Sequence, residues 1–183
     1  MSTDGTTVSR LSRALLWLFV INLGIALGAG LYESRIVIPG WIDTSGDSPV
    51  WSADAAREDD TGRRFWVAVT TVPLTLLTLA NLFAGWRAPA GLRRWWLGAA
   101  ATALVDRALT LGYFVPTMVG LMRMENAPDA AAAAVQWTQL NHLRHLLVAA
   151  AFLAALRAFS LLYAQRGSSV SPLSSEDRSR VKP

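Results

Sequence analysis

The sequence predicts an all-α membrane protein: a polytopic bundle of four transmembrane helices, with one long connection forming a cap on the outer side. Three observations predict this fold class: four long apolar segments, few charged residues, and an uneven distribution of Lys and Arg between the connections. The chain of 183 residues is 52% hydrophobic and 16% charged, whereas a soluble domain has roughly 25% charged residues. Its length allows one domain.

Each predicted span is long enough to cross a hydrocarbon core, which takes about 20 helical residues. The spans are residues 14–34, 65–86, 95–119 and 141–163. The first apolar run also suits a secretory signal peptide. We favour a span, because the run is long for that role and the remaining spans must be anchored in any case. Ionisable side chains interrupt the last two spans: Asp106, Arg107, His142, Arg144, His145 and Arg157.

The basic residues favour one orientation, because connections rich in Lys and Arg stay in the cytoplasm. They cluster before the first span, between the second and third, and after the fourth, whereas the connection 35–64 is rich in Asp and Glu. We therefore predict a multi-pass protein of the plasma (inner) membrane with both termini cytoplasmic. Residues 1–13 and 166–183 are predicted to be disordered tails, and the connection that holds Trp51 is predicted to fold onto the bundle as the cap.

The composition excludes several classes of function. The chain has no cysteine, which rules out disulfides, thiolate metal sites and cysteine redox chemistry. Its isoelectric point of about 10.3 would suit a nucleic-acid-binding protein. The basic residues, however, are spread among connections and tails and form no stripe interleaved with aromatic residues. Nucleic acid is therefore not a predicted partner.

Polar residues inside the predicted spans point to an internal pocket. A charge in the membrane costs about 2.5–3.5 kcal/mol on insertion scales, so such residues usually face the interior of a bundle. At about 100° per residue, polar stripes form on three of the four helices. Their members are Asn22 and Glu33; Thr102, Asp106, Thr110, Tyr113 and Thr117; and Trp137, Asn141, Arg144 and His145. We predict a pocket between the first, third and fourth helices, open to the outer side and floored near mid-membrane.

The buried charges need partners. Asp106 and Arg107 are adjacent and point about 100° apart, so we predict that they do not pair with each other. The predicted partners are Arg144 for Asp106 and Glu33 for Arg107. An alternative is a structural ion pair between Glu33 and Arg144. A further alternative is a metal site on His142 and His145, because histidines at i and i+3 can share one ion. The chain has no third histidine, and we predict no metal.

Four motifs carry a resemblance to a known family: GLYESRIVIPGW at 30–41, RFWVAVTTVPLTLL at 64–77, YFVPTM at 113–118 and W-x-x-L-N-x-x-R at 137–144. Over roughly residues 15–159, the chain resembles the small four-helix membrane proteins that are grouped in a domain-of-unknown-function family with the anthrone oxygenases. The resemblance implies cofactor-independent oxygenation of an aromatic anthrone to an anthraquinone. That reaction needs a base to remove a substrate proton, and groups that hold the resulting anion while it reduces dioxygen.

The resemblance gives the polar residues their roles. His145 or Asp106 would be the base, and Arg144 with Asn141 would stabilise the anion. Tyr113 and Trp137 would stack on a flat substrate, with Glu33 and Arg107 completing the binding site. No metal or other cofactor is expected, and the expected partners are the lipid bilayer and a small hydrophobic aromatic or quinone-like ligand. The alternative is a non-catalytic membrane module, such as a small transport component or a partner subunit.

Overall fold

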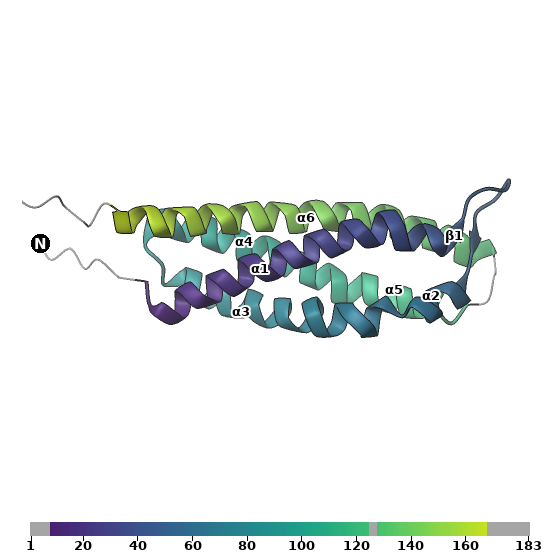
Figure 1. Ribbon diagram of the computed structural model, residues 1–183, viewed down its shortest axis with the longest axis horizontal. Coiled ribbons are helices and arrows are strands. Elements are labelled where there is room, and N and C mark those ends of the chain that lie inside the picture. The colour runs from purple at the N-terminus through teal and green to yellow at the C-terminus, as the bar shows by residue number, and fades with distance from the viewer. Residues whose placement is uncertain (1–7, 125–127, 168–183) are drawn as a thin grey trace, which may run out of the picture.

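The computed structural model describes residues 8–124 and 128–167, and this part of the chain is almost entirely helical (Figure 1). The predicted all-α class is confirmed. The first long segment consists of α1 (Arg10–Tyr32), the π-helical turn η1 (Glu33–Val37) and the 3₁₀ turn η2 (Ile38–Gly40). The connection after it contains β1 (Ile42–Asp43), β2 (Val50–Trp51) and α2 (Ala53–Asp59).

The remaining helical segments run alongside the first (Figure 1). The π-helical η3 (Gly62–Thr71) continues into α3 (Val72–Trp86). After a short connection, α4 (Ala90–Leu109) continues through the π-helical turn η4 (Thr110–Phe114) into α5 (Val115–Leu121). The described chain ends with α6 (Pro128–Gly167).

Within the described residues, three helices are long and apolar enough to cross a membrane: Arg10–Gly40, Gly62–Trp86 and Asp129–Ala164. The segment from Ala90 to Leu121 is of comparable length, but the buried Asp106 and Arg107 lower its hydropathy. The helices extend beyond the predicted spans. In particular, α1 begins at Arg10, inside the segment 1–13 that was predicted to be disordered, because Ser9 caps it by accepting a hydrogen bond from the Ser12 backbone N–H at 3.0 Å. Residues 1–7 and 168–183 lie outside the described residues.

Small residues let the helices pack closely at the end of the molecule where α1 begins. Alanines 99, 103, 151 and 155 are buried where α4 packs against α6, and small side chains allow helix backbones to approach one another. Trp96 is also fully buried there and donates its indole N–H to Asn81 Oδ1 at 2.9 Å. The Asn81 amide in turn donates to the backbone carbonyl of Leu15, which ties α3 to α1 and α4.

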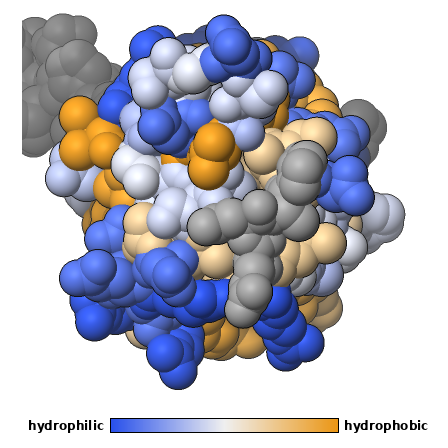
Figure 2. All heavy atoms as spheres, turned by 90° about the vertical axis from the view of Figure 1, so that its right-hand side faces the viewer, coloured by the Kyte–Doolittle hydropathy of each residue, from blue (hydrophilic) through white to orange (hydrophobic). Residues whose placement is uncertain are grey.

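At the opposite end, the connection between α1 and η3 packs against α5 and α6. Strands β1 and β2 pair antiparallel, with Ile42 opposite Trp51. The indole N–H of Trp51 donates to the carbonyl of Leu121 at 3.1 Å, and that of Trp41 donates to Asp59 at 2.7 Å. Both tryptophans are buried in one apolar cluster with Trp137 of α6. Hydrophilic residues cover much of the outer surface of this end (Figure 2).

Each of the three π-helical segments is followed, after one residue, by a proline. These are Pro39, Pro73 and Pro116. Proline has no backbone N–H and its ring clashes with the carbonyl four residues earlier, so the turn before it cannot keep regular α-helical bonding. In the second span the carbonyl that loses its partner belongs to Val69, and it accepts a hydrogen bond from the Asn22 amide at 2.9 Å instead. The prolines thus account for widened turns in three neighbouring helices.

Candidate functional site

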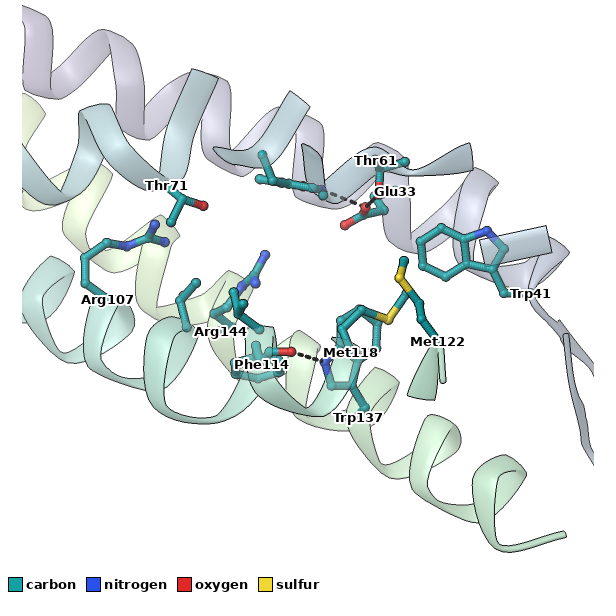
Figure 3. A pocket seen from close by; sticks show the side chains of 14 residues that line it. Glu33, Trp41, Thr61, Thr71, Arg107, Phe114, Met118, Met122, Trp137 and Arg144 are labelled. Atoms are coloured by element: carbon teal, nitrogen blue, oxygen red, sulfur yellow. Dashed lines mark hydrogen bonds between the residues drawn. The ribbon is translucent and has the colours of Figure 1, made fainter. Parts of the chain in front are cut away.

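All three widened turns line one pocket (Figure 3). Its empty space is about 570 Å³ when the open mouth is included. The polar lining side chains are Glu33, Thr61, Thr71, Arg107, Thr110 and Arg144. The aromatic and apolar ones are Trp41, Trp66, Phe114, Val115, Met118, Met122 and Trp137. The predicted pocket omitted the second span, yet η3 forms one of its walls.

Glu33 lies in η1, and its carboxylate is held by Thr61 and Trp66 of the neighbouring segment. Its Oε1 accepts a hydrogen bond from the Thr61 hydroxyl and another from the Trp66 indole N–H, both at 2.7 Å. The residue is only 8% exposed, and two fixed donors are what a buried carboxylate needs. The predicted pairing of Glu33 with Arg107 is wrong. Among the described residues, the only carboxylate that pairs with Arg107 is that of Asp106.

Arg107 forms an ion pair with Asp106, the residue that precedes it. Arg107 Nε donates to Asp106 Oδ2 at 3.0 Å, and Nη2 donates to the same oxygen. The prediction that these neighbours do not pair is therefore wrong. The angle of 100° separates their Cβ atoms, but a long arginine side chain can bend back across it. Both residues are buried, and only Arg107 reaches the pocket.

Arg144 faces the pocket from α6 without an ion-pair partner. Among residues 8–124 and 128–167, no carboxylate lies within salt-bridge distance of it, and its buried Nε has no hydrogen-bond partner. The predicted Asp106–Arg144 pair and the alternative Glu33–Arg144 pair are therefore both absent from the described structure. Instead, the guanidinium carbon lies 5.5 Å from the ring centre of Trp66 and 5.2 Å from that of Phe114, within the range of cation–π interactions.

Tyr113 was predicted to line the pocket, and Phe114 takes its place. A π-turn holds about one more residue than an α-turn, so η4 shifts the inward face of this helix by one position. Phe114 is 4% exposed and contacts the pocket, whereas Tyr113 packs against Phe114 with ring centres 5.2 Å apart. Periodicity at 100° per residue could not show this shift.

His145 and Asn141 lie on α6 next to the pocket but do not line it. His145 packs against α1 at Gly30, where an added Cβ would lie 2.7 Å from His145 Nε2. Asn141 is 1% exposed. Of the eight predicted site residues, the pocket thus brings together Glu33, Arg107, Trp137 and Arg144, and it leaves out Asp106, Tyr113, Asn141 and His145.

The most important residues that the sequence analysis missed are Trp66 and Thr61. They hold the Glu33 carboxylate, and Trp66 also lies beside Arg144. One sequence feature could have pointed to η3 as a wall of the pocket. An Ile-Pro or Val-Pro pair occurs at 38–39, 72–73 and 115–116, and each pair follows one of the three π-helical segments.

The histidines offer no metal site in the part of the chain that the structure describes. No group of three or more His, Cys, Asp or Glu side chains there could hold an ion. The His142 and His145 rings are 6.2 Å apart, and His142 is exposed while His145 is buried against α1.

Between aromatic walls, the pocket therefore combines a fixed carboxylate with a guanidinium that has no ion-pair partner among the described residues. Such an arrangement can accept a proton from a flat aromatic molecule and hold the anion that results. A comparison of the chain with protein-family models, with curated proteins and with solved structures gave no match.

Proposed function

We propose that the pocket binds a small, flat, hydroxylated aromatic molecule and oxygenates it without a cofactor, in the manner of the anthrone oxygenases. The observation that carries this proposal is the guanidinium of Arg144, which lies beside the rings of Trp66 and Phe114 and has no ion-pair partner in the part of the chain that the structure describes. Arg144 is half-buried with its Nε fully buried, and a charge taken out of water without a partner is costly. A phenolate anion between the rings would supply the missing partner, and its own ring would stack on the aromatic walls.

Glu33 is the proposed base, in place of His145 or Asp106. It is the carboxylate that lines the pocket, and only its Oε1 accepts hydrogen bonds from described residues. A general base must lie within reach of the proton that it removes. His145 is packed against Gly30, and the Asp106 carboxylate pairs with Arg107, so neither faces the ligand.

The reaction balances with dioxygen as the oxidant. Glu33 removes a proton from the substrate methylene, and Arg144 stabilises the anion. The anion passes one electron to dioxygen, and the carbon radical and superoxide combine into a peroxide, which takes the proton back from Glu33. Glu33 then removes the second C–H proton as the O–O bond breaks, and the departing hydroxide leaves as water. The sum is R₂CH₂ + O₂ → R₂C=O + H₂O.

The proposed setting is a membrane bundle of four spans, with 90–121 as the fourth and 41–59 as the outer cap. A helix of 32 residues is about 48 Å long, enough to cross a bilayer. The hydrophilic surface at the end formed by the connection suits contact with water (Figure 2). The distribution of Lys and Arg supports cytoplasmic termini in the plasma membrane.

The test is turnover of 1,8-dihydroxyanthrone by purified protein, followed by dioxygen consumption and by anthraquinone absorbance. We expect Arg144→Ala and Glu33→Gln each to lower kcat/KM by about 10²-fold or more. Arg157→Ala is the matched control, because Arg157 is an exposed arginine on the same helix. Size-exclusion profiles and circular dichroism establish that each variant is folded.

The results separate the candidate functions. Equal turnover by the Arg144→Ala and Arg157→Ala variants would refute the proposed role of the guanidinium. Saturable binding of 1,8-dihydroxyanthraquinone by the wild type without any dioxygen consumption would favour a non-catalytic binding module. Loss of folded protein in Arg144→Ala but not in Arg157→Ala would indicate a structural role for Arg144.

A further inference from the structure

The mouth of the pocket lies on one side of the molecule. Three lining residues are buried: Glu33 of η1, Trp41 directly after η2, and Arg107 of α4. On η3 and α5, in contrast, Trp66, Thr71 and Met118 are half-buried and Val115 is 43% exposed. Exposed lining therefore borders the gap between η3 and the η4–α5 segment.

The arrangement of the helices explains this gap. Helices α3 and α4 pack closely against each other, but η3 and η4–α5, which continue them, do not. The widened turns before Pro73 and Pro116 lie where the two segments separate. At the end of the molecule the connection partly covers the pocket: Trp41 lines it there, and Arg57 of α2 donates to the carbonyl of Met122 at 2.6 Å. Thr61, Gly62 and Met122, which line the pocket at this end, are half-buried.

The surface on both sides of the gap is apolar. Val67 of η3 and Val119 of the facing α5 are 48% and 43% exposed. Val115 lies six residues, about 9 Å, inside the end of α5, and Thr71 lies within the apolar span Gly62–Trp86. In a membrane, this border faces acyl chains.

We propose that the pocket is reached sideways from the lipid, through a portal between η3 and α5 that Thr71, Val115 and Met118 border. The identity of the ligand rests on the proposed function, whereas the portal rests on the packing of the helices. The ligand is then a molecule that dissolves in the bilayer in its neutral phenolic form and ionises only next to Glu33 and Arg144. Dioxygen, which is more soluble in hydrocarbon than in water, takes the same route.

A spin label tests the portal without any ligand. Because the chain has no cysteine, Met118→Cys alone places a nitroxide in the mouth of the pocket in lipid vesicles. Collision of the label with dioxygen reports access from the lipid, and collision with a water-soluble nickel chelate reports access from water. Labels at Val119→Cys and Asp47→Cys give the lipid and water references, since both residues are exposed, one on α5 and one in the connection.

We expect the label at position 118 to collide with dioxygen much as the label at 119 does and to be shielded from the nickel chelate. Adding Val115→Trp should lower the dioxygen collision rate at least two-fold, while Leu111→Trp, an exposed change outside the pocket, should not. The same Val115→Trp change should slow association of 1,8-dihydroxyanthraquinone from vesicles at least ten-fold relative to Leu111→Trp.

Nickel access at position 118 equal to that at position 47 would overturn the portal, as would identical dioxygen collision in the Val115→Trp and Leu111→Trp backgrounds. Neither result depends on the proposed chemistry. Failure of the wild type to bind the anthraquinone would instead defeat the proposed function, while the collision measurements would still decide the portal.

Discussion

Replacing Gly30 with alanine is expected to destabilise the protein and to move His145. Gly30 is buried in α1 where this helix packs against α6. A Cβ at Gly30 would lie 2.7 Å from His145 Nε2 and 2.9 Å from Cδ2. These distances are well below ordinary van der Waals contact, and the ring belongs to a buried side chain that cannot swing into solvent. The helices must therefore separate or the imidazole must rotate.

The magnitude follows from two opposing effects. Forcing one extra methyl group into a packed site typically costs about 1–3 kcal/mol. Alanine gains up to about 1 kcal/mol over glycine through helix propensity. The net expectation is a loss of about 0–2 kcal/mol in the free energy of unfolding. Gly28→Ala is the matched control, because a Cβ there meets no atom within 4 Å, and it should be neutral or stabilise by up to about 1 kcal/mol.

The assay is reversible unfolding in mixed micelles of increasing SDS fraction, followed by circular dichroism. The second readout is the double variant Gly30→Ala/His145→Ala, in which the added methyl group has room and the penalty of the alanine at position 30 should largely disappear. Equal stability of the Gly30→Ala and Gly28→Ala variants would refute the close contact between α1 and α6 at this level.

Three other perturbations test separate parts of the structure. Asn81→Leu leaves the buried indole N–H of Trp96 without its acceptor and should cost about 1–3 kcal/mol in the same assay. Trp51→Phe removes the hydrogen bond that ties β2 to α5 and should speed proteolysis within the connection while the helices stay resistant. A side-chain hydrogen bond from Arg63 lowers the pKa of Asp60 from its ordinary value of 3.8, so Arg63→Gln should raise it, as ¹³C NMR titration can measure. The small stability that this pair supplies is present above pH 3.8 and is lost as pH falls through the lower folded pKa.

The helices could be predicted from the sequence because each follows from apolar length. Ala14–Tyr32 carries no charge, and neither does 65–86, so only their ends were uncertain. The helix boundaries depend on local contacts that hydropathy does not register. The hydrogen bond from the Ser12 backbone to the Ser9 hydroxyl starts α1 earlier than predicted, and η1 and η2 extend the first segment to Gly40.

The site was only partly predictable, because its geometry depends on side-chain reach and on helix register. Regular α-helical angles placed Trp137 and Arg144 on one face correctly. These angles gave the wrong residue where the helix is not regular: in the η4 turn, Phe114 lines the pocket where Tyr113 was predicted. They also failed where a flexible side chain decides the partner, as in the pair of Asp106 with Arg107. An uncharged span gave no reason to expect Trp66 in the wall opposite Arg144.

The departures from regular structure occur in the three segments that line the pocket. Pro73 removes a backbone donor, and Asn22 must supply the hydrogen bond that the Val69 carbonyl would otherwise lack. In the pocket itself, Arg144 remains without an ion-pair partner among the described residues. A helix packed only for stability gains nothing from either feature, since both cost free energy. Widened helical turns occur frequently at functional sites. Their coincidence with an unpaired cation and the fixed carboxylate of Glu33 supports a ligand site rather than a purely structural bundle.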